Sequence, residues 1–97
     1  MKLNLIDLLE SWGSIHKDRL LENSEEGFSY RLRVQKAAFL LHKLKVKPFD
    51  KFDFSQYLHG PYSPDLARAY FKGEPLEFEA DDGVLDKLKK FMSHDND

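Results

Sequence analysis

Apolar side chains in the first part of the chain recur at helical spacing. Residues 3–12 place them on one broad face of a short helix, with Asn4 as a candidate N-cap and Gly13 as its stop. Residues 14–22 show a weaker pattern of the same kind. The stretch 22–29 is polar and contains a glycine, which predicts a loop. The chain is therefore expected to begin with two short helices and a connection.

The strongest helical pattern spans residues 30–45. Val34 and Leu41 belong to one apolar side of this helix, whereas Leu32 and Phe39, seven residues apart, lie on the other side. A helix that is apolar on two sides packs against more than one neighbour. We therefore expect residues 30–45 to form the central helix of the fold.

Two later stretches, residues 52–58 and 76–79, alternate apolar and polar side chains with the period of a half-buried strand. We expect these two strands to pair with each other. A helix between them begins with Ser63 as N-cap and Pro64 in its first turn, and it ends before Gly73. The pattern thus indicates a small two-stranded element with a helix in its connection.

A last helix is capped by Asp81 or Asp82 and presents one apolar stripe of Val84, Leu85, Leu88, Phe91 and Met92. Residues 1–92 are expected to form one globular domain, and residues 93–97 a frayed tail. The predicted fold class is mainly α with a small two-stranded β element, an α+β domain. A winged-helix arrangement is one form that such a domain takes.

Charge is distributed unevenly along a chain whose net charge is only −2. Residues 31–51 carry seven basic side chains and one acidic side chain. Residues 1–30 carry three basic and six acidic side chains, and residues 52–97 carry five basic and ten acidic ones. This asymmetry is typical of a surface for nucleic acid or an acidic partner, or of a basic centre that flanking acids neutralise within the fold. Both interpretations are open.

Composition excludes several classes of protein. The chain has no cysteine, which rules out disulfides, thiolate zinc sites and a thiol nucleophile, and which fits a reducing compartment. Asp7 and Glu10 interrupt the apolar start, and no cleavage pattern of a signal peptide follows. No apolar run approaches the roughly 20 residues that span a bilayer. We expect a cytoplasmic protein with no membrane partner.

Catalytic chemistry has little support in the sequence. The histidines, His16, His42, His59 and His94, are scattered and form no metal-binding pair of the HExxH type. Ser63 lies near His59, but it has a capping task and no nucleophile elbow surrounds it. There is also no glycine-rich phosphate loop. We therefore expect a protein that is not an enzyme and has neither a cofactor nor a metal site.

The segment HGPYSPDLARAYF, residues 59–71, combines a rigid corner with a capped helix. Gly60 permits backbone angles that other residues resist, and Pro61 stiffens the exit from the corner. Local structure therefore accounts for the glycine and the proline. It leaves His59 and Tyr62 unexplained, and we expect both to be exposed contact residues.

Two segments, RVQKAAFLL (residues 33–41) and YLHGPYSPDL (residues 57–66), resemble the Panacea, or SocA-like, antitoxin family. The family has a basic, apolar, Gln-Lys helix followed by an aromatic-bearing segment and a Gly-Pro turn. The residues that match this pattern are Gln35, Lys36, Gly60 and Pro61, and Tyr62-Ser63 is similar to the small YwgA-like branch. The resemblance covers residues 31–71.

This chain departs from the family in two respects. Ala37 and Ala38 stand where bulkier residues are usual, and the chain is shorter than most such domains. The resemblance implies a mainly helical fold and a non-catalytic role in which direct contact neutralises a toxin or presents another protein partner, such as the target of a protease adaptor.

Amphipathic rings gather around the Gly-Pro corner, and tyrosine is enriched at binding hot spots. The residues predicted to bind a partner protein are Tyr57, His59, Gly60, Pro61 and Tyr62. Aromatic residues at helical spacing are more often core residues, so Tyr70 and Phe71 are expected in the interior.

The alternative interpretation is a winged-helix DNA-binding protein. In it the basic helix 30–45 takes the recognition position and contacts phosphates or base edges. The residues that would make these contacts are Arg31, Arg33, Lys36 and Lys43.

Overall fold

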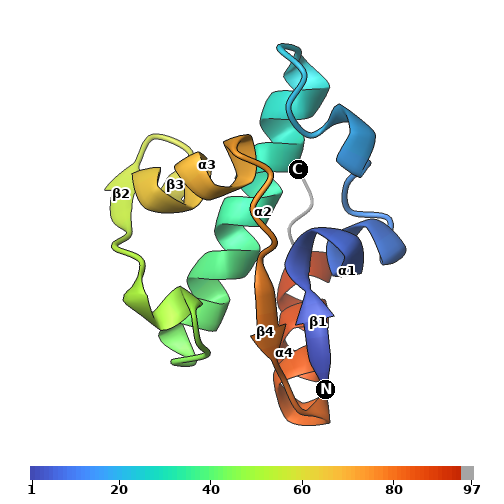
Figure 1. The fold of residues 1–97 in the computed structure, drawn as a ribbon, viewed down its shortest axis with the longest axis vertical. Coiled ribbons are helices and arrows are strands. Elements are labelled where there is room, and N and C mark those ends of the chain that lie inside the picture. Colours follow the sequence, from blue (N-terminus) through green and yellow to red (C-terminus); the bar gives the residue numbers. More distant parts are fainter. Residues whose placement is uncertain (95–97) are drawn as a thin grey trace.

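The longest element of the fold is a helix that crosses the whole domain (Figure 1). The computed structural model describes residues 1–94. In chain order its elements are β1 (Lys2–Asn4), α1 (Leu5–Ser11), the 3-10 turn η1 (Lys17–Arg19), α2 (Glu25–Lys43), the 3-10 turn η2 (Phe49–Lys51), β2 (Ser55–Tyr57), β3 (Gly60–Tyr62), α3 (Pro64–Phe71), β4 (Glu77–Glu79) and α4 (Asp82–Ser93). The prediction of a mainly helical α+β domain is confirmed.

Helix α2 is central, as predicted, but it begins earlier than its apolar pattern indicates. The hydroxyl of Ser24 accepts a hydrogen bond from the backbone N–H of Gly27 at 3.1 Å, and acidic residues fill the first turn. The loop predicted for residues 22–29 is therefore wrong in its second half. A β-carbon on Gly27 would lie 2.3 Å from the carbonyl oxygen of Glu22, so the glycine permits a close contact between the first turn of the helix and the backbone that precedes it.

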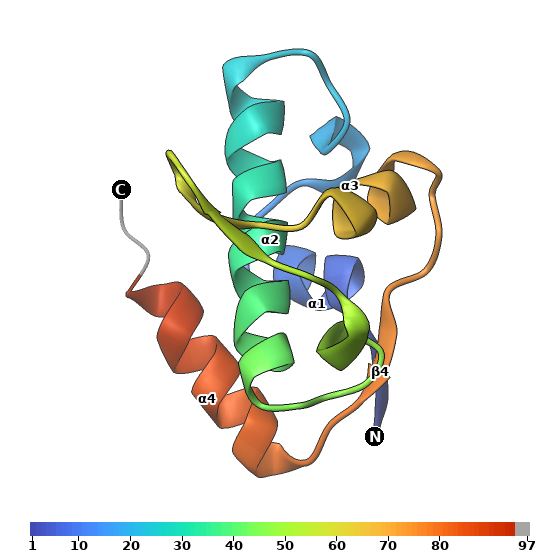
Figure 2. The ribbon, with the colours of Figure 1, turned by 90° about the vertical axis from the view of Figure 1, so that its left-hand side faces the viewer.

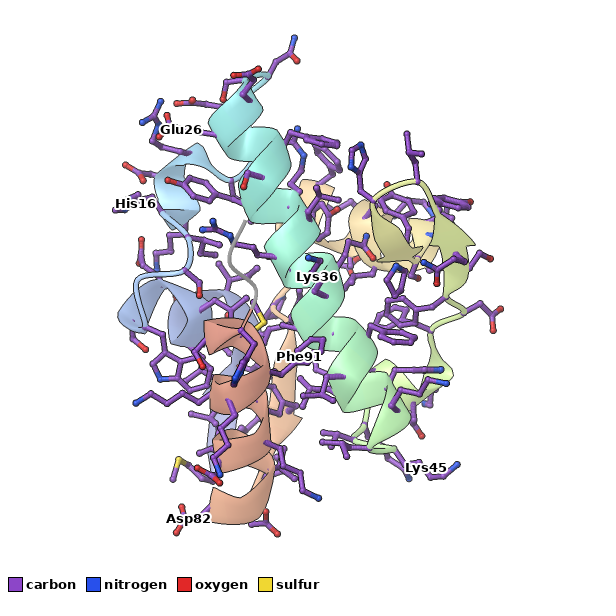
Figure 3. All side chains as sticks on the ribbon, turned by 180° about the vertical axis from the view of Figure 1, so that it is seen from behind. His16, Glu26, Lys36, Lys45, Asp82 and Phe91 are labelled. Carbon is purple, nitrogen blue, oxygen red and sulfur yellow. The ribbon has the colours of Figure 1, made fainter. Side chains whose placement is uncertain are left out.

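The core lies on one side of α2. Val34, Ala37, Ala38 and Leu41 are fully buried against neighbouring elements that include α1, η1, η2 and α4. Leu32 and Phe39 are half-buried on the other side. Figure 3 shows α2 between α4 on one side and the β2–β3 segment on the other.

The strands form two separate antiparallel pairs rather than the single pair predicted. β1 pairs with β4, with Leu3 opposite Phe78, and β2 pairs with β3, with Gln56 opposite Pro61. The predicted pairing of residues 52–58 with residues 76–79 is wrong. The chain reverses at Leu58 and His59, so β2 pairs with the strand that directly follows it. β4 instead pairs with Lys2–Asn4, at the start of the segment for which the apolar pattern predicts a helix.

Local capping signals are confirmed at three helices. Asn4 accepts hydrogen bonds from the N–H groups of Ile6 and Asp7, Ser63 accepts one from Leu66, and Asp81 accepts one from Val84. The helix expected over residues 14–22 is reduced to the single turn η1. Here the pattern was weak, and only Ile15 and Leu20 are buried.

The end of the chain is described only in part. Ser93 is the last residue of α4 and His94 is its C-cap, so the beginning of the predicted tail is helical. The rest of that predicted tail, residues 95–97, lies outside the described residues. Within residues 1–94, no helix combines the length and the apolar character needed to cross a membrane.

Candidate protein-binding groove

The side chain of Gln35 joins the middle of α2 to the segment that follows β3. Gln35 is only 1% exposed, and its Nε2 donates to the carbonyl of Ser63 at 3.1 Å and to the hydroxyl of Tyr70 at 3.2 Å. The N–H of Ser63 donates to Oε1 of Gln35 at 2.8 Å. Both ends of the amide are therefore satisfied, and one side chain connects the two segments that carry the family resemblance.

Strands β2 and β3 form a tight hairpin that lies across α2 (Figure 2). Gly60 has a φ of 115°, a conformation that side chains with a β-carbon rarely adopt. The rings of Tyr57 and Tyr62 stack with centroids 5.2 Å apart and planes 22° apart. The hairpin is thus a stiff element fixed at its exit by Gln35.

A groove of about 380 Å³ lies between this hairpin and the first turns of α2. Its lining consists of Phe28, Leu32, Tyr57, Leu58, His59, Gly60, Pro61 and Tyr62. The five residues predicted to bind a partner all line this groove. The ring of His59 meets Phe28 edge-on, with centroids 5.3 Å apart, and so connects the hairpin turn to α2.

Sequence reasoning missed Phe28, Leu32 and Leu58 as members of the site. The polar stretch 22–29 predicts a loop at Phe28, whereas the structure places Phe28 in α2, four residues before Leu32 on the same face of the helix. The signal that would have found it is Ser24 as an N-cap before two acidic residues. Leu58 is the most exposed large apolar side chain, at 94%, and no sequence pattern indicates this exposure.

The aromatic residues near the groove differ in burial. His59 is exposed as predicted, whereas Tyr62 is half-buried beneath Tyr57. Tyr70 is buried as expected, and burial raises the pKa of its hydroxyl above the ordinary value, although the hydrogen bond from Gln35 acts in the opposite direction. Phe71 is 54% exposed, so its predicted place in the core is wrong.

The basic residues proposed for nucleic acid lie apart from one another on α2. Nη1 of Arg31 donates to the carbonyls of Leu20 and Glu22 at 2.7 and 2.9 Å, and its guanidinium lies over the ring of Phe71. Nη1 of Arg33 donates to the carbonyl of Ser14. Both arginines are half-buried and hold the segment before α2 in place.

The two lysines of that set have other surroundings. Lys36 lies midway along the exposed side of α2 (Figure 3) and lines a second hollow with Phe39, Pro61, Phe91 and His94. The Nζ of Lys43 lies 5.4 Å from the centroid of Phe39, near the end of the helix. Of the four predicted residues, the two arginines are thus engaged with backbone carbonyls, whereas both lysines lie beside Phe39.

The histidines remain scattered in the structure. His16 packs edge-on against Tyr30, and Nδ1 of His42 lies 2.9 Å from the carbonyl oxygen of Phe49. Among residues 1–94, no cluster of three or more acidic or histidine side chains has the arrangement of a metal site.

No family model, curated protein or solved structure matches the chain. The family resemblance therefore stays a prediction that rests on the quoted residues.

Proposed function

We propose that the protein is a non-enzymatic interaction module that binds a partner protein through the groove between the β2–β3 hairpin and the start of α2. The observation that carries this proposal is the convergence of Tyr57, His59, Gly60, Pro61 and Tyr62 on one groove.

Exposed apolar surface around the groove supports the proposal. Phe28, Tyr57 and Leu58 are 45, 51 and 94% exposed, and all three border the same hollow. Large apolar side chains gathered on one part of a surface mark interaction sites more often than single ones do. Tyrosine supplies contact area with few rotatable bonds, which suits the centre of an interface.

Rigidity of the groove also favours binding. The Gln35 hydrogen bonds hold the hairpin exit, and the stacked tyrosine rings hold its two strands together. A surface that is already ordered loses less conformational entropy when a partner binds. Gln35 thus has a structural role beneath a surface that exposes Tyr57 and Leu58 to a partner.

The resemblance to the Panacea family and its YwgA-like branch supports the class of partner. The matching residues Gln35, Gly60 and Pro61 build or line the site. By this resemblance the partner is a toxin or another protein that the module presents, such as a protease-adaptor target. The alternative, a winged-helix DNA-binding protein, has less support, because Arg31 and Arg33 are engaged with backbone carbonyls.

Site-specific photocrosslinking in cells tests the proposal. A photoreactive amino acid at position 58 is expected to give a discrete crosslinked protein, whereas the same amino acid at Lys87, an exposed position on α4, gives none. Adding Tyr57→Ser and His59→Ser should weaken the crosslink and leave the rest of the domain folded, because neither side chain belongs to the buried core. Equal products at positions 58 and 87, or no product at 58, would contradict the proposal.

A further inference from the structure

A group of exposed lysines follows the last turns of α2, at the opposite end of the helix from Arg31. We call Lys43, Lys45, Lys47 and Lys51 the lysine cluster; all four are exposed. Figure 3 shows Lys45 projecting from this end of the helix, away from the body of the fold. Among the residues that the structure describes, no carboxylate forms an ion pair with any of the four. The structure thus concentrates unpaired positive charge in one short segment.

The segment that carries the lysine cluster is held in place by the core. The N–H of Val46 donates to the carbonyl of Leu41 at 2.9 Å, and the N–H of Asp50 donates to Val46 at 3.1 Å. The ring of Phe49 is fully buried and packs against Phe78. The lysines therefore project from a fixed backbone, which lowers the entropy lost when they bind a ligand together.

Lys45 separates two hollows on this surface. One, of about 360 Å³, is lined by His42, Lys43, Lys45 and Asp50, and the other, of about 760 Å³, is lined by Lys2, Lys45, Val46, Lys47, Pro48, Glu77, Phe78 and Glu79. In the larger hollow, Glu77 pairs with Lys2 and Glu79 pairs with the N-terminal amine. Asp50 is the carboxylate that lines the smaller hollow with Lys43 and Lys45.

Complementing the dipole of α2 explains only part of this arrangement. Cations near the C-terminus of a helix are favourable, but the effect falls off within the last turn. Lys43 belongs to that turn, whereas Lys47 and Lys51 lie beyond the end of the helix. The helix dipole therefore does not explain the positions of Lys47 and Lys51.

We propose that the lysine cluster binds the phosphodiester backbone of nucleic acid. Lysine is depleted at protein–protein interfaces, whereas interfaces with nucleic acid are rich in positive charge and contact phosphates through Lys and Arg. This surface shares only Lys43 with the nucleic-acid surface predicted from the sequence. Arg31 and Arg33 of that prediction donate to backbone carbonyls and are not part of the lysine cluster. The cluster also contains none of the residues that line the hairpin groove.

Fluorescence anisotropy with a labelled 20-base-pair duplex of mixed sequence, and with a single strand of equal charge, tests this proposal. The test variant is the triple substitution Lys43→Gln, Lys47→Gln, Lys51→Gln. Lys45 is left unchanged because its φ is 61°. The matched control is Lys72→Gln, Lys87→Gln, Lys89→Gln, which removes the same number of positive charges from exposed positions elsewhere.

Binding that neutralises up to four phosphates has a slope of about −3 to −4 in a plot of log affinity against log salt concentration, which is roughly a 100-fold loss between 50 and 200 mM salt. We expect the test variant to bind at least tenfold more weakly at 50 mM salt and to have a shallower slope. The control is expected to stay within about twofold of the parent. Asp50→Asn removes the opposing carboxylate and should strengthen binding.

Three outcomes would overturn the proposal. The first is absence of binding to either nucleic acid at 50 mM salt, and the second is an equal loss in the test and control variants. The third is displacement of the DNA by polyglutamate at the same charge concentration, which would assign the surface to an acidic protein. Circular dichroism spectra and melting temperatures of both variants establish that they are folded. Crosslinking at position 58 is independent of all these results.

Discussion

The two strand pairs of this protein have equal strand lengths but are attached to the fold in different ways. Each strand has three residues and each pair is antiparallel. In the β1–β4 pair, Phe78 is 3% exposed and its ring packs on Phe49. In the hairpin, every residue of β2 is exposed. The first pair is held by burial, whereas the second is held mainly through its exit at Ser63.

This difference shows how a small domain can present apolar side chains without losing its structure. The hydrogen bonds between Gln35 and Ser63 are made by buried groups, so water does not compete with them. They fix the hairpin without using Tyr57 or Leu58 for core packing. A pair of strands held by its own apolar face would have to bury those side chains instead.

The largest effect is expected from Phe78→Ala, which breaks the burial that holds the β1–β4 pair. Removing a buried phenyl ring leaves a cavity and costs about 3–5 kcal/mol in the free energy of unfolding. Urea denaturation measures this change. Phe91→Ala is the control, because the ring of Phe91 is partly exposed and its loss should cost far less. Similar small costs for both variants would contradict the assignment of Phe78 to the core.

A smaller but still substantial effect is expected from Gln35→Met, which removes the polar attachment of the hairpin. The buried N–H of Ser63 loses the side-chain oxygen that it bonds to, which costs about 1–3 kcal/mol, whereas the carbonyl of Ser63 still accepts a hydrogen bond from the N–H of Ala67. Amide hydrogen exchange should also accelerate more in β2 and β3 than in β1 and β4.

The same substitution at an exposed glutamine is the control for Gln35. Gln56→Met lies in β2 and should change the free energy of unfolding by less than about 0.5 kcal/mol. If the two variants are equally stable, Gln35 does not attach the hairpin. If Gln35→Met accelerates exchange uniformly over the protein, the hairpin does not open as a separate unit.

Features set by neighbouring residues could be predicted from the sequence. The caps at Asn4, Ser63 and Asp81 depend on side chains that reach only two or three residues along the chain. The predicted corner at Gly60 and Pro61 is displaced by two residues, because the chain reverses at Leu58 and His59 and the Gly-Pro pair belongs to β3. The groove could be predicted in part because Tyr57 and Tyr62 lie close to that corner in the sequence.

Features set by distant parts of the chain could not be predicted. β1 lies against β4 from the other end of the chain, and no local pattern indicates that pairing. Gly27 was interpreted as a loop residue, although the contact that requires it is with the backbone of Glu22 across a turn. Phe28 reaches the groove only because α2 carries it to the hairpin turn. These contacts depend on packing, which periodicity does not report.

A pH-dependent effect is expected from Tyr70, which accepts a hydrogen bond from the same Gln35 side chain that holds the hairpin exit. Burial raises the pKa of Tyr70 in the folded protein, so the folded state holds this proton more tightly than the unfolded state. The resulting stability is complete below the unfolded pKa of about 10 and is lost as pH rises through the folded pKa.

Tyr70→Phe tests this linkage by urea denaturation at pH 8, 10 and 11. At pH 8 the free energy of unfolding of the variant should be about 1 kcal/mol lower than that of the parent protein, because the hydrogen bond from Gln35 is lost. Above pH 10 its stability should fall less steeply than that of the parent protein. Tyr57→Phe, at an exposed position, should keep the parental steepness. Equal steepness in all three proteins would mean that Tyr70 is not linked to folding.

The smallest effect on stability is expected from Leu58→Ser, at the tip of the hairpin. Leu58 is 94% exposed, so the free energy of unfolding should change by less than about 0.5 kcal/mol. The identical substitution at Leu76, which is buried beside β4, should cost more than about 2 kcal/mol. For the protein identified by crosslinking, Leu58→Ser should weaken binding about 10- to 100-fold, because burial of a leucine at an interface contributes about 1.5–3 kcal/mol. Calorimetric titration measures that affinity, and an unchanged value would show that the exposed leucine is not part of the interface.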